Sequence, residues 1–170
     1  MIFDLSSDFD ALVEDYFSAA YGEDWGKVKE YFTRLGEIYE HKYIAGDKYA
    51  DRGDSRYYSP EHAEKMRGVY ALSEEFKPFF ESHKNMPMRA QTVAMRLLRR
   101  YAKLWESMAK PLILKAYGAD AEAKEAYLAV LDEIGKHEVE DERWFDLHQF
   151  GMAYDRRFTR KTDVMNIGAR

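Results

Sequence analysis

The sequence has 170 residues, of which 46% are hydrophobic, 15% aromatic and 34% charged. This composition excludes a disordered tail and provides enough apolar residues for the core of one globular domain. The net charge of −5 argues against a general attraction to nucleic acid. Cysteine is absent, which excludes disulfides, thiolate metal sites and thiol nucleophiles.

The sequence shows neither a membrane span nor a leader. No segment approaches the roughly 20 apolar residues that cross a bilayer, so a membrane partner is not expected. Residues 1–8 lack the basic and then apolar layout of a signal peptide. The absence of cysteine fixes no compartment, because many periplasmic proteins also lack it. The localisation therefore stays open.

The first predicted helix covers residues 8–21 and has one apolar face with i, i+3, i+4 spacing. That face consists of Phe9, Leu12, Val13, Tyr16, Phe17 and Ala20. Ser7 and Asp10 form a start signal of the capping-box kind, and Gly22 supplies a left-handed stop. A second helix is predicted over about residues 24–45, where Trp25 begins a further apolar stripe. The short link between the two predicts a helical hairpin.

A polar stretch, residues 46–59, is the longest loop candidate in the sequence. Four tyrosines flank or end it: Tyr43, Tyr49, Tyr57 and Tyr58. Exposed tyrosine rings stack on sugars or anchor protein interfaces. We therefore expect these four side chains to be exposed and to form the binding surface of the molecule.

Four prolines organise the middle of the chain. Ser59 and Pro60 are a strong helix start, and the third helix is expected to kink at Pro78. The longest helix begins at Pro87, and Pro111 should bend or break it.

Two more helices are predicted over residues 121–136 and 141–158. Strand signals are nearly absent, because β-branched residues are few and do not alternate with polar ones. The predicted fold is all-α: a single domain over residues 1–170, built as a compact bundle of about six mostly antiparallel helices with no sheet.

One internal echo accompanies this pattern. Ala20-Tyr21-Gly22 recurs as Ala116-Tyr117-Gly118, and at the same offset Tyr31 corresponds to Tyr127. The simpler explanation is that two helical hairpins use the same stop and the same packing face, although a duplication is the alternative.

Catalytic and metal-binding chemistry has no distinct signature. No histidine follows a glutamate by three positions, as metal sites of helical bundles require, and His-Glu-x-x-His is absent. Glu37, Glu40 and His41 lie close on one helix, but a solvated acidic face explains them better. The 31 acidic residues include no pair marked as buried, whereas a glycosidase needs two carboxyls across a cleft. No catalytic residue, cofactor or metal is predicted.

The most basic helix carries Arg89, Arg96, Arg99, Arg100 and Lys103. Together with Arg156, Arg157, Arg160 and Lys161 it suggests an anion-binding face. Ion pairs with acids on neighbouring helices, or an interface with a missing domain, explain these side chains better. Nucleic acid is not expected as a partner because the chain is acidic overall.

The order of residues in the first hairpin resembles a known family. The segments are Asp8-Phe9-Asp10-Ala11-Leu12-Val13-Glu14-Asp15-Tyr16-Phe17, Ala20-Tyr21-Gly22 and Val28-Lys29-Glu30-Tyr31-Phe32. They resemble the start of the C-terminal helical region of bacterial glycoside-hydrolase-like proteins of unknown function, which are distantly similar to α-glucuronidases. In that family the region follows a catalytic-type (β/α)8 barrel, whose strands have no counterpart in this sequence.

The resemblance implies a non-catalytic accessory domain of a carbohydrate-active protein, either packed on a catalytic barrel or mediating association. The barrel of the same parent protein would then be the partner, carbohydrate a further ligand, and this chain a fragment or C-terminal domain of an exported parent. Two other interpretations stay open: a free-standing helical protein-interaction module, including a homo-oligomer, and a small enzyme whose polar groups converge only in three dimensions. A large exposed apolar patch would favour the first two interpretations, and a deep pocket with two buried carboxylates the enzyme.

Overall fold

The computed structural model of the protein describes residues 8–137, 139 and 143–158. Within these residues the fold is all-α, as predicted, and contains no strand. The α-helices are α1 (Phe9–Tyr21), α2 (Trp25–Tyr39), α3 (His41–Ile44), α4 (Pro60–Met66), α5 (Gly68–Ser82), α6 (Arg89–Ala116), α7 (Asp120–Gly135) and α9 (Leu147–Phe158). A 3-10 helix, η1 (Ala50–Tyr57), lies between α3 and α4.

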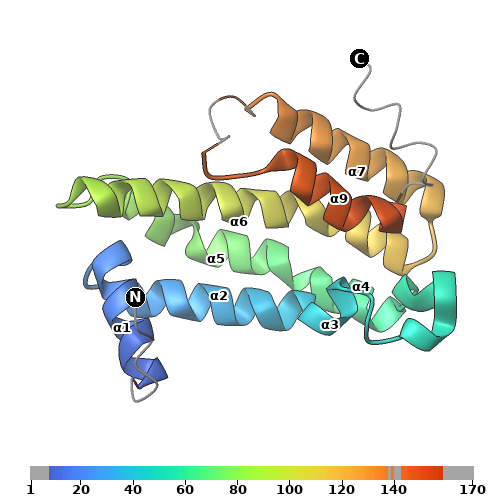
Figure 1. Cartoon of the computed structure of the whole chain (residues 1–170), viewed down its shortest axis with the longest axis horizontal. Coiled ribbons are helices and arrows are strands. Elements are labelled where there is room, and N and C mark those ends of the chain that lie inside the picture. Colours follow the sequence, from blue (N-terminus) through green and yellow to red (C-terminus); the bar gives the residue numbers. More distant parts are fainter. Residues whose placement is uncertain (1–7, 138, 140–142, 159–170) are drawn as a thin grey trace, which may run out of the picture.

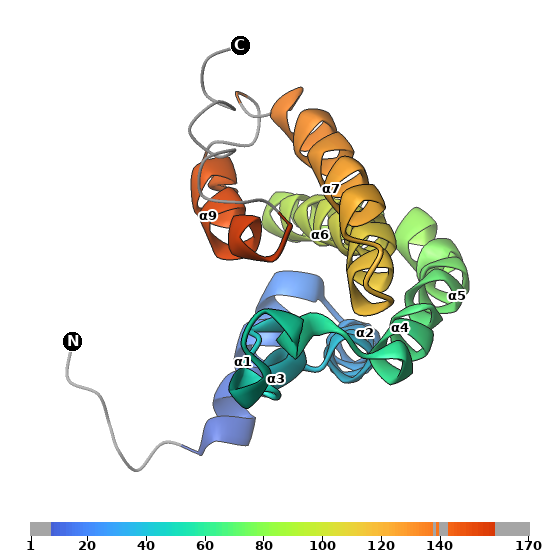
Figure 2. The ribbon, with the colours of Figure 1, turned by 90° about the vertical axis from the view of Figure 1, so that its right-hand side faces the viewer.

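The longest helix, α6, is the centre of the molecule and packs against α1, α4, α5 and α7. The long helices α2, α5, α6, α7 and α9 run back and forth along the same axis (Figure 1). Helix α1 is the exception. It lies across the end of α2, and its first turns project away from the rest of the molecule (Figure 2).

The described residues contain more helices than the six expected, because two predicted helices are each divided. The second breaks at Glu40, whose φ of +48° is left-handed and cannot continue an α-helix. The third is divided at Arg67 into α4 and α5. The expected loop at residues 46–59 also contains η1, which Gly53 interrupts with a φ of +60°.

Neither proline ends its helix, so the break considered at Pro111 does not occur, whereas the kink expected at Pro78 stays a prediction. Helix α5 continues through Pro78, and α6 remains one helix of 28 residues through Pro111. A proline removes one backbone hydrogen bond. Around Pro111 this loss is offset by burial, because Met108, Ala109 and Leu112 beside it belong to the core. Helix α9 begins at Leu147, later than the predicted start at 141: residues 143–146 are not helical, and residues 141–142 lie outside the described residues.

The two glycine stops of the sequence echo are confirmed. Gly22 ends α1 with a φ of +76°, and Gly118 follows α6 with a φ of +79°. Tyr31 and Tyr127, the corresponding tyrosines, are both fully buried. The equivalence does not extend to the tyrosine before each stop, because Tyr21 is half-buried whereas Tyr117 is exposed.

Aromatic side chains join the helices across the core. The rings of Phe17, Phe32, Tyr101, Trp105 and Tyr154 follow one another with centroids 5.6–6.2 Å apart. This row connects α1, α2, α6 and α9 and places Phe32 and Tyr101 beside the pocket described below. In the described part of the chain, no helix is both long enough and apolar enough to cross a membrane.

Candidate functional site

The four tyrosines expected to form a binding surface are mostly packed into the structure. Tyr43 is only 2% exposed, so the expectation of exposure is wrong for this residue, and Tyr49, Tyr57 and Tyr58 are half-buried. The Tyr43 hydroxyl donates to the carbonyl oxygen of Tyr57 (2.7 Å), and the Tyr58 hydroxyl donates to Asp120 (2.6 Å). Their hydroxyl groups therefore hold the loop in place.

A polar network lies beneath Tyr43. Its ring stacks on the imidazole of His62 with centroids 4.0 Å apart. His62 Nδ1 lies 2.8 Å from Ser59 Oγ, and His62 Nε2 lies 3.1 Å from Glu40 Oε2. Lys48 Nζ binds the other carboxylate oxygen of Glu40 at 2.8 Å. Hydrogen bonding to Lys48, and then to His62, lowers the pKa of the Glu40 carboxyl to about 2.

Ser59, His62 and Glu40 are the residue types of a hydrolase catalytic triad. Their surroundings, however, are not those of a catalytic site. Ser59 is buried, and its hydroxyl caps α4 by accepting from the backbone N–H of His62. A nucleophile must be reachable by substrate and must face donors for the developing oxyanion. The network instead connects the helix break at Glu40 with the start of α4, which is a structural role.

Two of the described residues that suggested an anion-binding face are buried or paired. Arg157 is buried, with its guanidinium 4.2 Å from the ring centroid of Tyr57, and burial lowers its pKa. Arg99 forms an ion pair with Glu81 at 2.8 Å, as one of the alternatives predicted. Arg160 and Lys161 lie outside the described residues.

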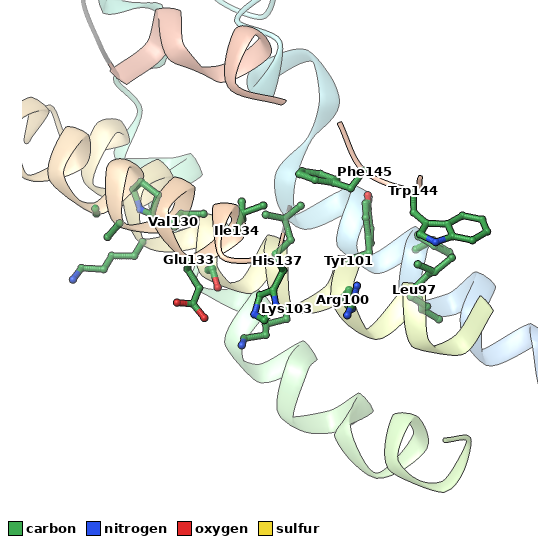
Figure 3. A pocket seen from close by; sticks show the side chains of 18 of the residues that line it. Leu97, Arg100, Tyr101, Lys103, Val130, Glu133, Ile134, His137, Trp144 and Phe145 are labelled. Atoms are coloured by element: carbon green, nitrogen blue, oxygen red, sulfur yellow. The ribbon is translucent and has the colours of Figure 1, made fainter. Parts of the chain in front are cut away.

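A large apolar pocket lies elsewhere, along α6, α7 and the segment that precedes α9 (Figure 3). Its volume is about 890 Å³, within the range of ligand-binding clefts. The walls include Leu97, Leu98, Leu104, Val130, Ile134 and Phe145. We call this feature the α6–α7 groove. Trp144, 58% exposed, stands at one end of it.

Cationic side chains line the α6–α7 groove on one edge. Arg100, Lys103 and Lys110 follow one another at helical spacing along α6, and His137 follows α7. Figure 3 shows Arg100, Lys103 and His137 on the same side of the groove. Among the described residues, Lys103 and Lys110 have no ion-pair partner within 4 Å.

Glu133 is the one carboxylate among the described residues that line the groove. Glu133 is exposed and forms an ion pair with Lys136 at 2.9 Å, which lowers its pKa. Among the described residues that line the groove, cationic side chains outnumber carboxylates, which favours an anionic ligand. Within the described residues, no three His, Asp or Glu side chains are arranged to hold a metal ion.

Apolar periodicity alone would place the leucines of this groove in the core of the molecule. Leu97, Leu98 and Leu104 do lie on the apolar face of α6, but α7 does not cover that face completely. The signal that could have identified the groove is the row of Arg100, Lys103 and Lys110 directly beside this face. Neither protein-family models, nor characterised proteins, nor solved structures give a match to this chain.

Proposed function

We propose that the chain is a non-catalytic helical module that binds an apolar, acidic segment of a protein partner in the α6–α7 groove. The observation that carries this proposal is the combination of apolar walls with a cationic edge. Burial of apolar side chains in the groove supplies the driving force, at roughly 25 cal/mol per Å². The cations of α6 select partners with acidic flanks, because complementary potentials speed association and suppress wrong partners.

The first hairpin resembles the C-terminal helical region of bacterial glycoside-hydrolase-like proteins, and this resemblance suggests which protein the module belongs to. On this basis it is an accessory domain of a bacterial carbohydrate-active protein, and the partner segment belongs to the (β/α)8 barrel of the same parent. Carbohydrate is a second candidate ligand. It is favoured by the exposed ring of Trp144, since tryptophan faces stack on sugars.

The contents of the groove argue against the enzyme interpretation. A glycosidase needs two carboxyl groups across its cleft, whereas Glu133 is the one carboxylate among the described residues that line the α6–α7 groove. We expect the isolated chain to leave aryl glycosides and aryl glucuronides intact. Steady hydrolysis that a Glu133→Gln substitution abolishes would contradict the proposal.

The dye 8-anilinonaphthalene-1-sulfonate is a direct probe of the groove, because it joins apolar rings to one anionic group. We expect saturable fluorescence enhancement with the folded chain. Leu97→Glu and Lys103→Glu should each weaken dye binding at least tenfold, because one changes the wall and the other the cationic edge.

Met88→Glu is the control for these variants, since Met88 is an exposed apolar residue outside the groove. Circular dichroism and thermal melting establish that each variant is folded. If folded Leu97→Glu and Lys103→Glu both bind the dye as the unsubstituted chain does, the groove is not the site and the proposal fails.

A further inference from the structure

Helix α1 has an apolar face that the described part of the chain leaves exposed. Phe9, Leu12 and Tyr16 are 75%, 53% and 67% exposed, and α1 contains no buried residue. The spacing of these three residues places them on one side of the helix, and we call them the α1 stripe. The other side of α1 packs on the molecule through Phe17, whose ring lies 6.2 Å from that of Phe32. Exposed apolar groups of this kind mark interaction surfaces.

The charges of α1 are all acidic. Asp8 caps the helix, Asp10, Glu14 and Asp15 follow within its first two turns, and no lysine or arginine occurs between residues 8 and 24. The α1 stripe therefore has the two properties that the α6–α7 groove selects: apolar side chains and flanking negative charge. The cations at the groove edge, Lys103 among them, have the opposite sign.

The dimensions of the two surfaces agree. The α1 stripe covers about two helical turns, or roughly 11 Å at 1.5 Å per residue. The groove follows α6 from Leu97 to Pro111, a rise of about 21 Å on the same scale. The stripe therefore fits within the length of the groove.

The groove of the same molecule is not available to this stripe. The carboxyl end of α1 is fixed beside that groove, because Tyr21 lines it and Gln91 donates to the carbonyl oxygen of Ala19 at 3.3 Å. From there the helix runs outward, so its first turns point away from the molecule (Figure 2). A second copy of the chain can present its groove to them.

We infer that the α1 stripe of one copy docks in the α6–α7 groove of a second copy. This inference rests on the proposed function of the groove and names its occupant. If the exchange is reciprocal, the pair has two-fold symmetry and two equivalent contacts, so that no acidic stripe or cationic groove is left without a partner.

Sedimentation velocity of the full chain over a range of concentrations tests this inference. We expect a concentration-dependent species of twice the 20.0 kDa chain mass. Leu12→Glu in the stripe and Leu97→Glu in the groove should each raise the dissociation constant at least tenfold. Met88→Glu is the matched control, because Met88 has the same 53% exposure as Leu12 but lies on neither surface.

A mixture of the Leu12→Glu and Leu97→Glu chains distinguishes this pairing from others. One intact contact remains in the mixture, between the stripe of the Leu97→Glu chain and the groove of the Leu12→Glu chain. The mixture should therefore associate more strongly than either variant alone. A pairing of stripe with stripe would instead be insensitive to Leu97→Glu.

The inference is overturned if the unsubstituted chain stays monomeric at all concentrations, or if either folded variant dimerises as well as the control. It is also overturned if the mixture associates no more strongly than its components. If the chain is monomeric but its groove still binds the anionic dye, and Leu97→Glu weakens that binding, only the assignment of the α1 stripe as the occupant is refuted. Loss of that dye dependence would refute the proposed function as well.

Discussion

The loop region around Tyr43 and the α6–α7 groove use aromatic side chains in opposite ways. Around Tyr43, rings and hydroxyl groups fill the space between α3, η1 and α4 and bind one another. In the groove, Trp144 and its neighbours surround space that the chain itself does not fill. The difference shows that a tyrosine beside a polar loop can be buried, as Tyr43 is. We propose uncovered apolar area beside cationic side chains as the better indicator of a binding surface.

The largest expected effect is a difference in the free energy of unfolding between alanine substitutions in the two regions. Tyr43→Ala removes a buried ring, its stacking on His62 and its hydrogen bond to Tyr57, and should lower the free energy of unfolding by about 3–5 kcal/mol. Trp144→Ala should change it by less than about 1 kcal/mol, because Trp144 is largely exposed. Urea denaturation measures both values. If both substitutions lower the free energy of unfolding equally, the two regions do not differ in packing as described.

A second effect concerns the packing of the loop region. Gly46 has a φ of +81°, and a Cβ there would lie 2.6 Å from Tyr57 Oη. Gly46→Ala should therefore cost about 2–4 kcal/mol, the sum of backbone strain and overpacking. Gly53→Ala is the matched control: its φ is +60°, but no heavy atom lies within 4 Å, so only the backbone cost of about 1 kcal/mol applies.

The difference between the two glycine variants in urea denaturation isolates the steric contribution. If Gly46→Ala is no more destabilising than Gly53→Ala, the ring of Tyr57 is free to move and the loop region is not tightly packed.

The smallest expected effect is a pH dependence. The pKa of Glu40 is lowered from 4.5 to about 2 in the folded chain, so its ion pair stabilises the fold above pH 4.5. This contribution is lost as the pH falls from 4.5 toward 2. It should amount to less than about 1 kcal/mol, because Glu40 is partly exposed and salt screens the pair.

Thermal melting of the unsubstituted chain and of Glu40→Gln at pH 6 and pH 3 measures this dependence at low salt. Acidification should destabilise the unsubstituted chain more than the variant. Identical losses in the two chains would show that Glu40 contributes nothing to the pH dependence.

The fold class and most helix positions could be predicted from the sequence, because they depend on local spacing and local stop signals. The apolar spacing of residues 9–21 and the left-handed glycines after α1 and α6 are examples. The break at Glu40 was not predicted, and the side chains that Glu40 contacts there, Lys48 and His62, approach it only in the folded chain. Continuity through Pro111 likewise depends on tertiary packing.

The candidate site was less accessible to sequence analysis than the fold. The spacing of Leu97, Leu98 and Leu104 identifies an apolar face, but it does not say how much of that face a neighbouring helix covers. The same limit applies to α1. The apolar residues of α1 cover enough of the helix circumference to form two surfaces, one packed through Phe17 and one exposed at Leu12. Periodicity alone does not show which residues belong to which surface.

The central claim is that the α6–α7 groove accepts an acidic, apolar helix. A fluorescein-labelled peptide of residues 8–21, titrated with the monomeric Leu12→Glu chain and followed by fluorescence anisotropy, tests it most directly. We predict saturable binding, weakened at least tenfold when Leu97→Glu is added to the chain. Absence of binding to the folded Leu12→Glu chain, or equal binding to the chain with both substitutions, would contradict the claim.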